Sequence, residues 1–253
     1  MFCRAGCYQQ SSRGVSGVTE PLTDNVTIQY VLTLPDGARE TIDLLLDGHL
    51  EVLHQNTAPD ALPSWTALAY HQCPNCPLSV LTHPRCALAV NLVDVMRFSN
   101  KLISHDEVLM EVITQERRIA QRTTAQRAIS SLMGLIVATS GCPHSTFLRP
   151  MARFHLPLAS EEETIYRATS MYLLAQYFLK NEERAVDFSL EGLVERYKIL
   201  QKVNLAIADR LRAASETDAS INAVVLLDIY AKTMPYAIKD SLEDIRYLFS
   251  SYF

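Results

Sequence analysis

Glycine is scarce in this sequence, with eight residues in a chain of 253, and several glycine-dependent motifs are missing. There is no phosphate-binding glycine loop, no dinucleotide-binding glycine pattern, no nucleophile elbow and no HExxH motif. The chain also has no uncharged apolar run of about 18 residues, the minimum for a transmembrane helix. These absences argue against nucleotide-dependent chemistry and predict that no helix spans a membrane.

A surplus of positive charge is missing as well. The formal net charge is −5, so no overall field attracts nucleic acid or an anionic membrane. Residues 1–24 are polar, without an apolar period or the apolar core of a secretory signal, and are predicted to form a mobile arm. We therefore expect a soluble, cytoplasmic protein that binds neither nucleic acid nor membrane. Its six cysteines should then stay reduced.

Alternating apolar and polar residues predict β-structure after the arm. The alternation runs from Val26 to Leu34, is interrupted by the turn sequence Pro35-Asp36-Gly37, and resumes from Ile42 to Leu46. This pattern is typical of a β-hairpin with one buried face. The segment Val108–Thr114 fits a further strand, although its mixed pattern also permits a helix.

Helical periodicity dominates the rest of the chain. Helices are predicted after Cys86, from about Thr124 to Thr139, from the capping-box residue Ser160 and from Ser189. Two shorter helices, Ile221–Thr233 and Ser241–Phe249, are expected on either side of Pro235. The predicted fold class is α+β, with an N-terminal antiparallel hairpin or small sheet, a cysteine-rich middle segment and a C-terminal antiparallel helical bundle. We expect one domain over residues 25–253. It comprises a β-hairpin and cysteine-rich part, 25–158, and the helical bundle, 159–253.

A cysteine constellation carries the main functional signal. Cys73 and Cys76 are three positions apart, a spacing that lets both sulfurs bind one metal ion from a single turn. Cys86 and Cys142 can complete a tetrahedral zinc site, and three histidines are candidate substitutes. These substitutes are His144, His71 and His83. Gly141, which can end the preceding helix, is expected to hold Cys142 at a fixed exit.

Other interpretations of these cysteines remain open. Four thiolates serve an iron–sulfur cluster equally well, and a CxxC pair also supports thiol redox chemistry. The cysteines can also be plain buried residues, since cysteine is commonly buried whatever its role. Pro74 and Pro77 lack the backbone N–H groups that would otherwise stabilise the thiolate of Cys73. Cys3 and Cys7, which lie in the arm, are expected to be passive thiols.

A basic cluster follows the last of these cysteines. Arg149, Arg153 and His155 could together bind the phosphate or carboxylate of a cofactor or substrate, because arginine offers two parallel donors. The alternative is that the arginines form structural ion pairs with Glu161–Glu163.

Several segments together resemble an uncharacterised bacterial family. They are Trp65, Cys73-Pro74-Asn75-Cys76-Pro77-Leu78, Ser140-Gly141-Cys142-Pro143, and the run from Arg149 to Pro157, RPMARFHLP. The resemblance, to a domain of unknown function, extends from about Thr27 to about Ala231. It implies a bacterial origin and supplies no activity.

The functional hypothesis is a regulatory or protein-interaction role for a protein with a structural zinc site and a helical bundle that engages a partner. The alternative is a metal- or iron–sulfur-dependent enzyme that acts on a small anionic substrate. A catalytic zinc keeps one coordination position open, whereas a structural zinc is closed by four protein ligands.

Overall fold

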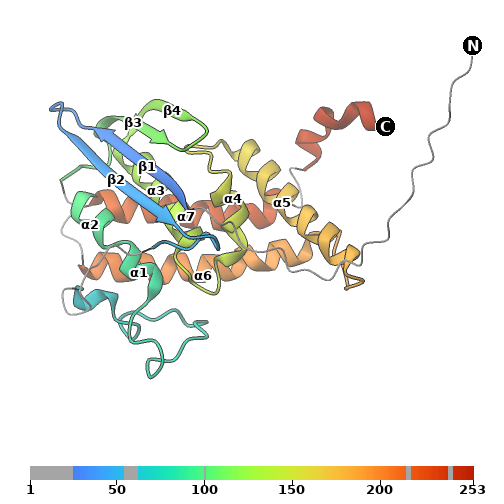
Figure 1. Ribbon diagram of the computed structural model, residues 1–253, viewed down its shortest axis with the longest axis horizontal. Coiled ribbons are helices and arrows are strands. Elements are labelled where there is room, and N and C mark those ends of the chain that lie inside the picture. Colours follow the sequence, from blue (N-terminus) through green and yellow to red (C-terminus); the bar gives the residue numbers. More distant parts are fainter. Residues whose placement is uncertain (1–24, 54–61, 100, 215–217, 239–241) are drawn as a thin grey trace, which may run out of the picture.

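A computed structural model describes residues 25–53, 62–99, 101–214, 218–238 and 242–253. The predicted arm, with Cys3 and Cys7, lies outside the described residues. Within them, a four-stranded antiparallel sheet is followed by a mostly helical remainder (Figure 1). The fold is α+β, as predicted.

The predicted hairpin forms one side of the sheet. Strands β1 (Val26–Thr33) and β2 (Arg39–Leu46) pair in antiparallel register. Gly37 adopts a positive φ of 85° in the connecting turn, a conformation that suits glycine. The Asp36 carboxylate accepts a hydrogen bond of 2.9 Å from the backbone N–H of Ala38. The turn sequence therefore determines the register, as expected for this type of signal.

Two later strands complete the sheet in the order β2-β1-β3-β4. β3 (Glu107–Ile113) pairs with β1, which confirms the strand alternative for that segment. β4 (Arg118–Thr124) was not predicted. Its side chains are mostly exposed, so no buried face imposes an alternation on its sequence.

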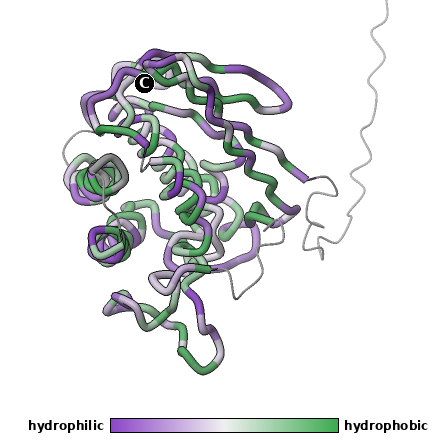
Figure 2. The backbone as a smooth tube through the Cα atoms, turned by 90° about the vertical axis from the view of Figure 1, so that its left-hand side faces the viewer, coloured by the Kyte–Doolittle hydropathy of each residue, from purple (hydrophilic) through white to green (hydrophobic). Residues whose placement is uncertain are grey.

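Helix α3 (Ala125–Thr139) is the centre of the molecule. Eleven of its fifteen residues are buried, because the sheet lies on one side of it and α7 (Asp218–Tyr236) packs on another. Figure 2 looks along the long helices and shows the sheet and the helix pair on different sides of the molecule. The apolar stripe predicted for this helix is thus confirmed and extends around most of its circumference.

The remaining helices are η2 (Ser64–Thr66), α1 (Ala87–Asn91), α2 (Val93–Ser99), η3 (Thr146–Leu148), α4 (Arg149–Arg153), α5 (Glu161–Asn181), α6 (Glu191–Ala214) and η5 (Glu243–Tyr252). Among them, α1, α2, η3 and α4 pack against α3. Ser160 and Glu163 form the predicted capping box at the start of α5. α6 and α7 pack side by side (Figure 1).

One predicted helix boundary was wrong. Pro235 was expected to separate two helices, but it lies inside α7, which continues to Tyr236. Proline lacks a backbone donor and therefore weakens a helix most in its interior. Near the end of α7 this loss is small, so the helix passes the proline before it ends.

None of the helices in the described ranges is both long and apolar enough to cross a lipid bilayer.

Candidate metal centre and interior cavity

The Cys73–Cys76 segment forms the tight turn that its spacing predicted. The backbone N–H of Cys76 donates a hydrogen bond of 3.0 Å to the carbonyl of Cys73. Cys86 lies at the start of α1, and its N–H donates to the carbonyl of Thr66 at 2.9 Å. Both segments are therefore fixed by backbone hydrogen bonds rather than placed on free loops.

The exit of α3 brings a third segment to this turn. Gly141 has a positive φ of 77°, which turns the chain directly after the helix and before Cys142. Two residues later, the His144 imidazole Nε2 lies 2.7 Å from the carbonyl oxygen of Asn75, between the two cysteines of the turn. The prediction that Gly141 fixes this exit is supported by the geometry, and His144 connects it to the Cys73–Cys76 turn.

Electrostatic coupling indicates that the four thiols are neighbours. Burial and, second, charge repulsion from Cys86, Cys142 and Cys76 together raise the pKa of the Cys73 thiol to about 12. Burial also raises the pKa of Cys142. A hydrogen bond from the His144 backbone lowers this pKa, and the charge of Cys86 raises it. The thiols of three separate segments thus lie within interaction range of one another.

The thiols are near one another without forming a ready metal shell. Across the described ranges, no group of three or more histidine, cysteine, aspartate or glutamate side chains is arranged so that it could hold a metal ion. His71 and His83 are both exposed, and His83 Nδ1 lies 2.9 Å from the Thr82 hydroxyl. The zinc and iron–sulfur assignments therefore remain predictions.

A buried arginine, Arg210 of α6, lies beside the cysteines. Its side chain is 1% exposed and donates hydrogen bonds to the carbonyls of Trp65, Ala67 and Leu68, the Ala67 bond being 2.7 Å. Within the described part of the chain it has no carboxylate partner. Burial lowers its pKa, whereas the negative charge of Cys86 and Cys73 opposes that shift.

Sequence reasoning missed Arg210, although a signal was present. Arg210 is three positions after the buried residue Ile207 and adjoins Leu211 on the apolar side of α6. An arginine within an apolar stripe marks a buried cation, which requires hydrogen-bond acceptors or a counter-charge.

The predicted basic cluster separates into different environments. Arg149 pairs with Glu51, and Arg153 pairs with Glu116 at 3.1 Å. The ion-pair alternative thus describes both arginines, with these glutamates as partners instead of Glu161–Glu163. His155 is placed differently, since its Nε2 lies 2.5 Å from the Tyr30 hydroxyl and its side chain lines a cavity.

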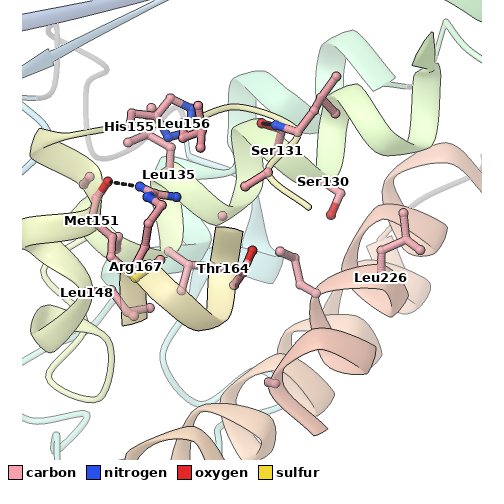
Figure 3. Close-up of a pocket in the computed structure, with 18 of the residues that line it drawn as sticks. Ser130, Ser131, Leu135, Leu148, Met151, His155, Leu156, Thr164, Arg167 and Leu226 are labelled. Carbon is pink, nitrogen blue, oxygen red and sulfur yellow. Dashed lines mark hydrogen bonds between the residues drawn. The ribbon is translucent and has the colours of Figure 1, made fainter. Parts of the chain in front are cut away.

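This cavity has a volume of about 310 Å³ and lies between α3, α4, α5, α6 and α7 (Figure 3). Its walls are largely apolar, with Leu135 of α3 and Leu148 opposite the α7 residue Leu226. The polar groups in the wall include Arg167 and Tyr197, neither of which was predicted to belong to a site. Neither Arg149 nor Arg153 lines the cavity.

A comparison with protein families gives one match, which covers residues 28–250. The matching family is described as a domain of unknown function, DUF6901. The chain belongs to this family. No curated protein and no solved structure matches this DUF6901 chain. The family assignment confirms the resemblance to an uncharacterised family, brings no activity with it, and leaves the bacterial origin a prediction.

The environment of His155 predicts a loss of stability in mild acid. Burial and, second, the positive charge of Arg167 lower the pKa of His155 to about 3 in the folded protein. In the unfolded chain its pKa is about 6.5, so between pH 6.5 and pH 3 only the unfolded state takes up a proton there. The free energy of unfolding should therefore decrease as the pH is lowered from 6.5 to 3. This group contributes up to about 1.4 kcal/mol per pH unit to that decrease.

Urea unfolding of the wild type and of His155→Gln at pH 7, 6, 5 and 4 tests this expectation. The variant should lose less stability than the wild type over the same range, because Gln does not titrate. His105→Gln, which changes an exposed histidine, is the control and should follow the wild type. Equal pH slopes for His155→Gln and the wild type would contradict the prediction.

Proposed function

We propose that the four cysteines bind one structural zinc ion that fastens the cysteine-rich segments to the exit of α3. The observation that carries this proposal is the meeting of three cysteine-bearing segments. The His144 imidazole, two residues after Cys142, lies 2.7 Å from the Asn75 carbonyl oxygen between Cys73 and Cys76, and the charges of Cys86, Cys142 and Cys76 all act on Cys73. Zinc–sulfur bonds of about 2.3 Å require the sulfurs to approach to about 3.5–4 Å. Metal binding must therefore draw the side chains together around positions that the backbone already holds.

Two features of the surrounding protein favour a charged centre at this place. Zinc bound by four thiolates keeps a net negative charge, and Arg210 is a buried cation without a carboxylate partner in the described ranges. The second feature is Asn75, inside the Cys73–Cys76 turn. Its side-chain nitrogen and oxygen are buried and have no hydrogen-bond partner among the described residues. A thiolate drawn toward a metal would give the Asn75 amide an acceptor.

The position of the cysteines favours a structural over a catalytic metal. None of the four lines the cavity between the helices, the one apolar-walled pocket described above. Four protein ligands would also close the coordination sphere of zinc. The proposal places the protein in the cytoplasm, where thiols stay reduced and available to the metal.

Elemental analysis with an absorption spectrum of anaerobically purified protein tests this function. We expect about one zinc per chain and no visible absorption, as for a closed-shell ion. Iron with acid-labile sulfide and visible absorption would instead support an iron–sulfur cluster at the same cysteines. Protein that contains no metal, and whose thermal stability is unchanged by zinc or by a chelator, would overturn the proposal.

The protein-interaction role is supported by an exposed face of α5. Leu174, Tyr177 and Phe178 are 55%, 54% and 56% exposed, and Leu173 is 38% exposed. Residues 170–179 carry no charged side chain. Figure 1 shows this end of α5 reaching toward the edge of the molecule, away from the sheet. Clustered exposed apolar side chains of this size are typical of association surfaces.

We propose a second copy of this chain as the occupant of the α5 face. An uncharged face can meet its own copy about a two-fold axis without bringing like charges together. A partner of different sequence would need a matching neutral face, whereas the second copy provides one by symmetry.

Light scattering after size-exclusion chromatography should give the mass of two chains at tens of micromolar protein. The double variant Leu174→Glu/Phe178→Glu should give the mass of one chain, because charge would have to be buried between the two copies. Leu205→Glu, which charges an exposed leucine of α6, is the control and should remain dimeric. A wild-type mass of one chain at all concentrations would disprove self-association.

A further inference from the structure

The cavity between the helices is a separate feature from the cysteine centre. Five α-helices, the short helix η3 and the segment 155–159 contribute to its walls, and α3 supplies the largest share. Gly134 of α3 lines the cavity and faces Leu227 of α7, which a Cβ at this position would meet at an ordinary contact distance of 3.5 Å. The cavity is thus formed by packed helices together with the connection between α4 and α5, which supplies His155, Leu156 and Leu158.

One end of the cavity presents a partly engaged cation. Arg167 of α5 donates from Nη2 to the carbonyl of Met151 at 2.9 Å (Figure 3). The same nitrogen donates to the carbonyl of Phe154, also at 2.9 Å. In the described part of the chain, Nη1 and Nε of Arg167 have no hydrogen-bond partner, and Arg167 forms no ion pair. The nearest acidic influence is Glu163, whose carboxylate already accepts from the backbone N–H of Ser160.

The charges around the cavity are of one sign. Arg127 and Arg167 line it, and no aspartate or glutamate among the described residues does so. Burial lowers the pKa of Arg167, but a guanidinium remains protonated at neutral pH. His155, which also lines the cavity, is neutral there. The cavity therefore presents positive charge with no acidic side chain among its described lining residues, an arrangement that favours an anion.

A buried hydroxyl lies within the influence of this cation. Tyr197 of α6 is 5% exposed, lines the cavity and has no hydrogen-bond partner for its hydroxyl among the described residues. Arg167 and Tyr197 both line the cavity, and the charge of Arg167 acts on the Tyr197 phenol. Burial raises the pKa of Tyr197, so the phenol stays protonated and can donate a hydrogen bond.

The remaining walls define the rest of the ligand. Apolar side chains from four helices continue the cavity away from Arg167, toward Leu226 on the opposite side of Figure 3. At about 30 Å³ for each water-sized unit, a volume of about 310 Å³ holds roughly ten non-hydrogen atoms. A carboxylate with an aliphatic tail of about eight carbons in total has this size.

We propose that this cavity binds a medium-chain aliphatic monocarboxylate. Arg167 and Tyr197 hold the carboxylate oxygens, and the tail lies along α3 toward α7. Because both Nη2 hydrogens are given to carbonyls, an N–H on Nη1 or Nε can donate to one carboxylate oxygen and the phenol hydroxyl to the other. Most of the remaining wall is apolar and suits an aliphatic tail. This site is independent of the proposed zinc ion.

Calorimetric titration of the full chain with octanoate tests the site, with octan-1-ol and butyrate as matched probes. Octanoate should bind saturably at one site per chain, and both the uncharged head and the short tail should weaken binding by about tenfold or more. Arg167→Met should weaken octanoate binding by about tenfold or more. Tyr197→Phe should weaken it by about fivefold, the loss of one hydrogen bond.

Arg153→Met is the control, because it removes an arginine that is ion-paired outside the cavity and should leave octanoate affinity unchanged. If Arg167→Met does not fold, Tyr197→Phe and the ¹³C carboxyl shift of labelled octanoate decide the matter. The bound carboxyl should keep the shift of the ionised form at a pH where free octanoate is protonated. Absence of saturable octanoate binding, equal binding of octan-1-ol, or a bound carboxyl that titrates like the free acid would each overturn the proposal.

Discussion

Replacing Cys73 and Cys76 together by serine is expected to release the bound metal and to lower the melting temperature by about 10 °C or more. Structural zinc contributes its binding free energy to folding, and a loss of about 5 kcal/mol is modest for such a site. For a chain of this size, about 1 kcal/mol corresponds to a shift of roughly 2–4 °C. Differential scanning calorimetry with elemental analysis of the same samples measures both effects.

The double variant Cys3→Ser/Cys7→Ser is the matched control. These cysteines lie in the predicted arm, so metal content and melting temperature should stay at wild-type values. Deletion of residues 1–24 should give the same result. If the arm variants lost the metal and the Cys73/Cys76 variant kept it, the ligands would have been assigned to the wrong segments.

Arg210→Met should be among the most destabilising single substitutions in the protein, with a loss of about 3 kcal/mol or more. The substitution removes donors from the carbonyls of Trp65, Ala67 and Leu68, and hydrogen bonds from a charged donor contribute about 1.5–3 kcal/mol each. Part of this loss is offset because a buried charge disappears. Urea unfolding of the zinc-loaded protein measures the change.

The same substitution should also weaken zinc binding, since it removes the positive charge beside the thiolates. Competition with a coloured chelator measures this second effect. Arg212→Met is the control on the same helix, because Arg212 is half-exposed and its one ion-pair partner among the described residues is Asp209. A stability loss for Arg210→Met no larger than that for Arg212→Met would show that Arg210 does not hold the segment 65–68.

Much of the fold could be predicted because local signals agreed with the tertiary structure. The turn at Pro35-Asp36-Gly37, the buried stripe of α3 and the capping box at Ser160 each depend on neighbours close in the sequence. β4 had no such signal, since its pairing with β3 uses backbone groups and its side chains remain mostly exposed. The strand order was also beyond local reasoning, because β1 pairs with a strand about 80 positions later.

The candidate sites were predictable to different degrees. The meeting of the α3 exit with the Cys73–Cys76 turn was anticipated from Gly141, and the observed contact is made by His144 and Asn75. A shared coordination shell for Cys142 and the turn stays a prediction. The environments of the basic-cluster residues were not anticipated, because the arginines pair with residues distant in the sequence, Glu51 and Glu116. Arg167 and Tyr197 come from different helices, and only the packing of those helices reveals that they face one cavity.

The central position of α3 has a consequence for synthesis on the ribosome. The sheet and this very apolar helix are complete once residue 139 has emerged, but α7, which covers a further side of α3, begins only at residue 218. A nascent chain therefore exposes the side of α3 that faces α7 while about 80 further residues are translated. At the usual 5–20 residues per second, this interval lasts several seconds, which is long enough for a ribosome-associated chaperone to bind.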